Sequence, residues 1–152
     1  MHPEPIRRHR IALWGGMALF AAAIFGWSWW RWWTFRYTTF DLAFYVQALS
    51  EALHGRWHVS LLDVPLLGNH AEPIVFLLLP LFAVWPHAMV PVLVQTIAVA
   101  TMPLTAMRIG RALGLGEKEA LLLALSTLLA PATGWMAPVS YTHLTLPTKR
   151  IV

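Results

Sequence analysis

Long apolar runs separated by short polar stretches dominate the sequence. The first run, residues 11–30, follows a basic segment, residues 1–10, that contains three arginines. About twenty apolar residues in a helix are enough to cross the hydrocarbon core of a bilayer. A secretory signal peptide is the rival interpretation, but bulky tryptophans stand where a small-residue cleavage site belongs. The pattern therefore predicts an uncleaved membrane anchor.

Three further apolar segments follow, at residues 73–87, 88–107 and 119–137. The first is short for a span and contains Pro80, so it crosses only with its flanks included, and otherwise it is re-entrant. The second is long enough by itself, and the third supplies a fourth span. The fold class that follows is all-α: a polytopic integral membrane protein with about four transmembrane helices.

Residues 31–72, between the first two apolar segments, form the most polar internal part of the chain and are expected to be an external loop. Apolar side chains recur at helical spacing, and polar side chains lie on the opposite side. The apolar set is Leu42, Tyr45, Val46, Leu49, Ala52 and Leu53, and the polar set is Gln47, Ser50, Glu51 and His54. Asp41 is placed to be the N-cap of this helix and Gly55 its C-terminal stop. A one-sided apolar stripe predicts an amphipathic helix that lies on the membrane surface.

Composition supports the membrane class. Of the 152 residues, 58% are hydrophobic and 12% charged, and nine are tryptophan, which is unusual for a soluble domain. The net charge is +4, but the basic residues are scattered between apolar runs, so nucleic acid is not an expected partner. The chain has no cysteine, which excludes disulfides, iron–sulfur clusters and cysteine-based zinc sites.

The basic residues also predict an orientation. The N-terminal arginines hold the N-terminus in the cytoplasm of a multi-pass inner (plasma) membrane protein, and the tryptophans of residues 27–33 form an aromatic belt at the far interface. The alternative role of these tryptophans is to stack a sugar or a base. Four spans would place Arg108, Arg111 and Lys118 outside, against the positive-inside rule. A re-entrant segment at 74–85 would move them inside.

Three stretches carry a family resemblance: TFRYTTFDLAFYVQAL, LLGNHAEPIVFLLLPLFAVWPH and PLTAMRIGRALGLG. They resemble the bacterial and archaeal membrane proteins grouped as domain of unknown function 2079, over most of residues 30–137. That layout is in turn similar to the front end of the GT-C glycosyltransferases, with an inside N-terminus, one span and an external loop that carries an acid. The resemblance implies an enzyme that transfers a sugar from a polyprenyl-phosphate donor at the external membrane face.

Under this resemblance Asp41 matches the acid of the first external loop. In such enzymes that acid is the general base acting on the acceptor, or it helps to hold a divalent metal. The wider superfamily often has two neighbouring acids, and this sequence has one, which weakens the case for a metal. The structural alternative is an N-cap aspartate, which contributes about 1 kcal/mol to helix stability.

Four more residues are candidates for substrate binding: His70, Glu72, Arg36 and Arg56. An ionisable pair at the mouth of a span should face a cavity or a partner, where it can hold a donor phosphate or a metal. The arginines can clamp phosphate. The structural alternatives are capping of the span and contact with lipid headgroups. The other function class is a non-catalytic transporter or assembly component, in which these residues line a solute path or dock a partner.

The last segment, residues 138–152, departs abruptly from the Ala/Leu-rich chain before it. Val139 to Thr148 can be written in codons that match the transposase adapter of shotgun sequencing libraries. We therefore expect that the authentic protein is cut near Ala137 and that the fragment alone is inactive. Sequencing the source locus without library preparation should find a different continuation after Ala137, and finding this tail encoded there would refute the expectation.

Overall fold

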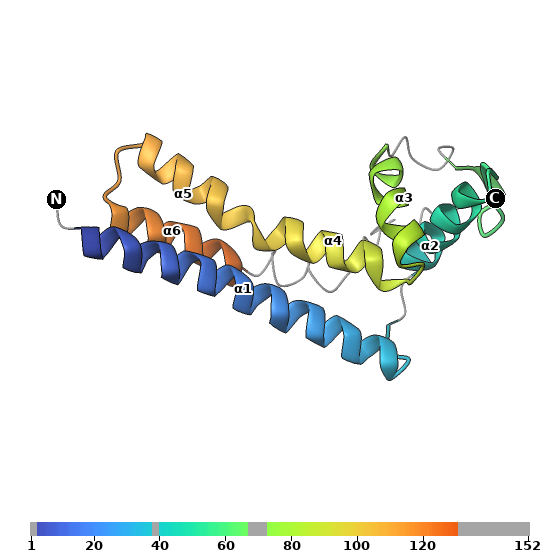
Figure 1. The fold of residues 1–152 in the computed structure, drawn as a ribbon, viewed down its shortest axis with the longest axis horizontal. Helices are drawn as coiled ribbons and strands as arrows, with labels where there is room; N and C mark the ends of the chain where they lie inside the picture. The colour runs from blue at the N-terminus through green and yellow to red at the C-terminus, as the bar shows by residue number, and fades with distance from the viewer. Residues whose placement is uncertain (1–2, 38–39, 67–72, 131–152) are drawn as a thin grey trace, which may run out of the picture.

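The computed structural model describes residues 3–37, 40–66 and 73–130 (Figure 1). Over these residues the chain is helical apart from one two-stranded hairpin, so the all-α fold class is confirmed. The helices and strands are α1 (Pro3–Trp33), α2 (Phe40–Leu53), β1 (His58–Val59), β2 (Val64–Pro65), α3 (Ile74–Val84), α4 (Met89–Ala100), α5 (Met102–Ala112) and α6 (Glu117–Leu129).

Two long rods set the shape of the molecule. α1 runs along the long axis, and α4 and α5 together run beside it (Figure 1). Residues 7–33 and 89–112, with 27 and 24 residues, are long and apolar enough to cross a membrane. Only Thr101 separates α4 from α5, and Pro103 lies in the first turn of α5, where its missing N–H is tolerated. The apolar segment predicted at residues 88–107 thus stays helical to Ala112.

α1 contacts the other helices near both of its ends. At what we call the N-terminal end, Leu13 and Met17 pack against residues of α5 and α6: Met107, Ala120, Leu121 and Ala124. At the other end, which we call the tryptophan end, Trp29 and Trp32 pack against a buried cluster: Leu42, Met89 and Val92. Much of the remaining α1 surface is exposed and apolar, which suits a helix surrounded by lipid.

α5 and α6 form a tight hairpin that lies beside the N-terminus of α1 (Figure 1). Gly114 has a φ of +82° and its N–H donates to the carbonyl of Arg111 at 3.0 Å. The N–H of Leu115 donates to the carbonyl of Gly110, also at 3.0 Å, which completes a Schellman motif. Gly110 is buried, and a Cβ there would lie 3.3 Å from side chains that include Ala120. A Cβ at Gly110 would therefore make its neighbours shift, and Gly114 supplies the left-handed conformation of the turn.

α2 and α3 lie at the tryptophan end, with α3 running across the direction of the long rods (Figure 1). The buried residues of α2 match the predicted stripe only in part. Leu42, Leu49 and Ala52 are buried as predicted, Phe44 and Ala48 are buried although the predicted stripe did not include them, and Leu53 is 41% exposed. Most of this stripe packs against α3 and the β-hairpin. α3 has 11 residues and does not reach the length of a span by itself, so the count of about four spans stays a prediction.

The predicted ends of α2 are half right. Gly55 is the stop, since its φ is +70° and the N–H of Arg56 donates to the carbonyl of Glu51 at 2.9 Å. The N-cap prediction for Asp41 is wrong, because the helix begins one residue earlier, at Phe40. Asp41 instead lies in the first helical turn.

Replacing Gly114 by alanine should destabilise the α5–α6 hairpin by about 1 kcal/mol, because a Cβ disfavours the left-handed conformation. A Cβ at Gly114 would have no atom within 4 Å, so backbone strain alone acts. Thermal unfolding in detergent measures the loss. Gly15→Ala is the matched control, since Gly15 is helical and equally uncrowded, and it should be neutral or slightly stabilising. Equal losses in both variants would contradict this account.

Candidate functional site

Asp41 lies in the first turn of α2, with a half-buried side chain. The next residue, Leu42, is 3% exposed and packs with Met89 and Val92 of α4 beside the rings of Trp29 and Trp32. This contact fixes the start of α2 against the tryptophan end of the two rods. The positive end of the helix dipole favours a carboxylate in this turn. The side chain of Asp41 is therefore held at a fixed position at the tryptophan end.

A stack of aromatic rings, which the sequence analysis did not single out, lies at the same end. The ring of His87 stacks on Trp85 and on Trp29, with centroids 5.0 Å and 5.4 Å away, and Trp32 meets it edge-on at 5.6 Å. The N–H of Met89 donates to Nδ1 of His87 at 3.1 Å, so the neutral ring carries its proton on Nε2. The available signal was the spacing of Trp29 and Trp32, which places both on one helix face.

Two buried hydroxyls belong to the tryptophan end as well. Neither Ser28 Oγ nor Tyr37 Oη has a hydrogen-bond partner of ordinary geometry. Burial raises the pKa of the Tyr37 phenol, and the opposing effects of the Arg31 charge and of the nearby Ser28 hydroxyl are smaller. The Arg31 guanidinium lies over the Tyr37 ring, 5.2 Å from its centroid. These groups supply neutral donors and a cation next to the aromatic stack.

Arg36 lies where the chain leaves α1. The turn passes through Phe35, whose φ of +54° is unusual for a side chain of this size. The guanidinium of Arg36 lies 5.3 Å from the centroid of the Trp30 ring. The backbone carbonyl of Arg36 accepts a hydrogen bond from the Arg31 guanidinium at 3.0 Å. A cation held on an interfacial tryptophan is well placed to meet a phosphate. The structure thus places Arg36 at the tryptophan end.

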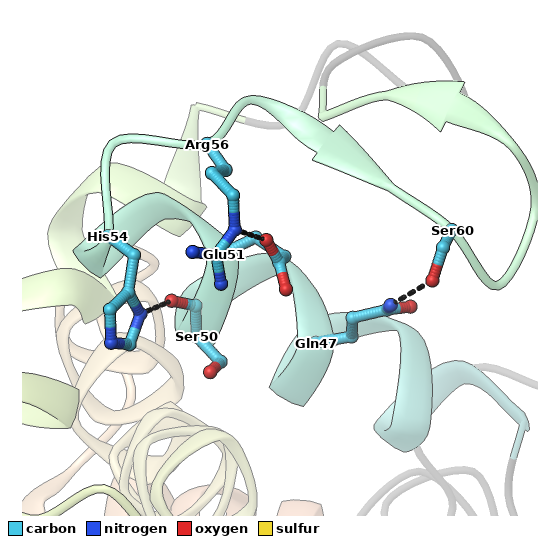
Figure 2. Close-up of polar contacts among 6 residues, drawn as sticks. All are labelled: Gln47, Ser50, Glu51, His54, Arg56 and Ser60. Atoms are coloured by element: carbon cyan, nitrogen blue, oxygen red, sulfur yellow. Dashed lines mark hydrogen bonds and ion pairs between the residues drawn. The ribbon is translucent and has the colours of Figure 1, made fainter.

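Arg56 lies at the opposite end of α2 from Asp41. The helix from Asp41 to Leu53 rises about 18 Å, which prevents the two side chains from acting on one atom. Figure 2 shows the Arg56 guanidinium paired with the Glu51 carboxylate. The hydrogen bond between them lowers the pKa of Glu51 and raises the pKa of Arg56. Arg56 therefore stabilises the end of the helix in this structure.

Other polar contacts hold the β-hairpin onto α2 (Figure 2). The Gln47 amide donates to the Ser60 hydroxyl, and its Oε1 accepts from the N–H of Leu61 at 3.1 Å. His54 Nδ1 lies 2.7 Å from the carbonyl of Ser50. Within the described ranges 3–37, 40–66 and 73–130, no three His, Cys, Asp or Glu side chains gather closely enough to hold a metal ion. The predicted pair His70 and Glu72 lies outside the described residues.

Replacing His87 by alanine should destabilise the protein by about 2 kcal/mol, because it removes several aromatic contacts of the tryptophan end. Phenylalanine at this position keeps the stacking but removes the Nδ1 atom that accepts a hydrogen bond from the N–H of Met89. His87→Phe should therefore lower the free energy of unfolding by about 1 kcal/mol. Thermal unfolding in detergent measures both losses. His54→Ala, at an exposed histidine, is the control and should change stability by less than about 0.5 kcal/mol. Equal stability of wild type and His87→Ala would show that the stack is not stabilising.

Comparison with known proteins confirms the family resemblance. The model of the family described as "Predicted membrane protein (DUF2079)" matches residues 31–135. No curated protein and no solved structure matches the chain. The matched region begins at the tryptophan end of α1 and covers Asp41, the aromatic partners Trp85 and His87, and all of α2 to α6. The chain therefore belongs to the DUF2079 family of membrane proteins.

Proposed function

We propose that this membrane protein is a GT-C-like glycosyltransferase that uses a polyprenyl-phosphate-linked sugar at the external face of the inner membrane. Asp41 is the general base that takes the proton from the acceptor hydroxyl as that hydroxyl attacks the anomeric carbon of the sugar, the bond from this carbon to the phosphate oxygen breaks, and the polyprenyl phosphate leaves. The supporting observation is the place of Asp41, in a helical turn anchored through Leu42 to the tryptophan end of two rods of membrane-spanning length. A base in this position can reach both a water-borne acceptor and a lipid-borne donor.

The surroundings of Asp41 fit the two parts of such a donor. Exposed aromatic side chains at this end, such as Trp33 and Trp85, offer apolar surface for a sugar ring or for isoprenoid carbons. Arg31 and Arg36 offer guanidinium groups at the same end, and guanidinium groups match phosphate geometry. The chemistry of a lipid-phosphate sugar is thus matched by residues close to the proposed base.

The remaining predicted residues keep subordinate roles in the proposal. His70 and Glu72 precede α3 in sequence and are proposed to bind the edge of the donor phosphate. Arg56 is proposed to contact only the far part of a long acceptor, because Glu51 neutralises it and α2 separates it from Asp41. The N-terminus is proposed to be cytoplasmic, which places Asp41 on the external side of the membrane after one crossing by α1.

Asp41→Asn should reduce sugar transfer about a hundredfold or more, because the amide cannot accept the acceptor proton. The measurement is transfer of labelled sugar from a polyprenyl-phosphate donor in membranes that contain the complete protein encoded at the source locus. The variant should reach the membrane at the wild-type level, since Asn is also tolerated near a helix N-terminus.

The matched control is Asp63→Asn, in the same external segment. The Asp63 carboxylate is 93% exposed and pairs with His58 at 2.9 Å, and its φ of +54° is a conformation that Asn adopts readily. This variant should keep full transfer. Unchanged transfer by Asp41→Asn would remove Asp41 from the mechanism. A wild-type protein that transfers no sugar from any polyprenyl donor would favour the transporter or assembly class.

A further inference from the structure

The length of α3 does not match the thickness of a bilayer. Its 11 residues rise about 16 Å, roughly half of a hydrocarbon core of about 30 Å. The flanking residues do not extend it, because Pro73 precedes it and Trp85, with a φ of −135°, ends it just before Pro86. Apolar helices of this length are typical of buried, re-entrant or interfacial segments.

The turn between α3 and α4 shows at which end of the molecule the chain leaves α3. His87, in this turn, stacks on Trp29 and meets Trp32, both near the C-terminus of α1. The loop that carries α2 and the β-hairpin begins at that same end of α1. A helix that crossed the membrane would have carried residues 85–88 to the opposite interface. In the structure the chain enters and leaves α3 at the tryptophan end.

The α5–α6 turn lies at the opposite end, beside the N-terminal segment. Leu13 packs with Met107 and Ala120, and the hydrogen bond that Arg111 donates to Glu117 is the main cause that lowers the pKa of Glu117, with a smaller contribution from the nearby His9. Along α4 and α5, Met89 and Met107 are about 27 Å apart by helical rise, close to the thickness of the hydrocarbon core. The two ends of the molecule therefore match the two interfaces of one bilayer.

Charge separates the two ends in the same way. Among the described side chains, the N-terminal end carries six basic residues and two acids, and the segments at the tryptophan end carry three of each. The first set is Arg7, Arg8, Arg10, Arg108, Arg111, Lys118, Glu117 and Glu119, and the second is Arg31, Arg36, Arg56, Asp41, Glu51 and Asp63. The positive-inside rule assigns the more basic end to the cytoplasm.

We infer that α3 lies in the outer leaflet without crossing the membrane, so that the N-terminus and the α5–α6 turn are both cytoplasmic. The partner of its exposed face is the acyl region of outer-leaflet lipids, which covers Phe76, Leu77, Leu81 and Val84. The opposite face packs on α2 and α4 through Val75, Leu78 and Phe82. The chain then crosses at α1 and at α4–α5, α6 leads back from the cytoplasmic end, and Arg108, Arg111 and Lys118 satisfy the positive-inside rule.

Single cysteines test this arrangement directly, because the chain has none of its own. The three positions are Leu62 in the hairpin turn, Pro86 in the α3–α4 turn and Leu113 in the α5–α6 turn, and all three side chains are exposed. Each variant, Leu62→Cys, Pro86→Cys or Leu113→Cys, is made in the full chain and expressed in cells. A membrane-impermeant maleimide is then added before or after permeabilisation of the inner membrane.

Cysteines at 62 and 86 should react in intact cells, and the cysteine at 113 should react only after permeabilisation. The converse result at 86 and 113, with 62 still external, would show that α3 crosses the membrane and would overturn the inference. That result would leave the proposed role of Asp41 intact. A cysteine at 62 that reacts only after permeabilisation would overturn the orientation and the proposed external catalysis together.

Discussion

The length of each helix relative to the thickness of the bilayer is the constraint on which this structure depends. A backbone N–H or C=O that is left unpaired in lipid is destabilising by several kcal/mol, so a helix in lipid can end only near an interface or where its last groups are paired. α1 and the α4–α5 rod are long enough to place their ends at two interfaces, and α3 is not. The side of the membrane on which each loop lies follows from this difference.

The C-termini of α1, α2 and α5 are closed by the same hydrogen-bonding pattern. Phe35, Gly55 and Gly114 each adopt a positive φ, and the residue after each of them donates its N–H five residues back, to the carbonyls of Arg31, Glu51 and Gly110. Two of the three positions use glycine, as expected for this conformation. Phe35 is the exception, because its backbone conformation is strained for a residue with a large side chain. Its aromatic ring is 93% exposed and lies at the tryptophan end.

The two ends of the molecule are packed by different side chains. At the N-terminal end small residues let helices approach closely: Gly16 faces Leu125, and Gly110 faces Ala120. Close packing of small residues is how helices associate in lipid, where burial of apolar surface gives little drive. The cluster under α2 instead uses large side chains such as Phe44, Leu49 and Phe82.

Local features were predicted from the sequence, and contacts between distant segments were not. The α2 helix and its stop at Gly55 depend only on spacing and on glycine chemistry, and both are confirmed, whereas the predicted stripe is confirmed only at Leu42, Leu49 and Ala52. The ring contacts of His87 with Trp29 join residues far apart in the chain, so no local pattern announces them. Hydropathy likewise shows that residues 74–85 are apolar, but it does not show whether their helix runs across the membrane or along it. The pairing of Arg56 with Glu51 arises from the turn at Gly55, which a motif-based prediction of phosphate binding does not consider.

In the proposed arrangement the depth of Asp41 in the membrane follows from the position of α3. α2 packs on α3 through its central residues, such as Phe44 and Ala48, and on α4 through Leu42, so it bridges the two helices. α4 fixes the lateral position of the first turn, because Leu42 is buried against Met89. If α3 rests in the outer leaflet, its lipid-facing side chains set how far this assembly sinks below the headgroups. A base that serves both a lipid-borne donor and a water-borne acceptor requires that depth to be fixed, and a short helix that does not cross supplies it.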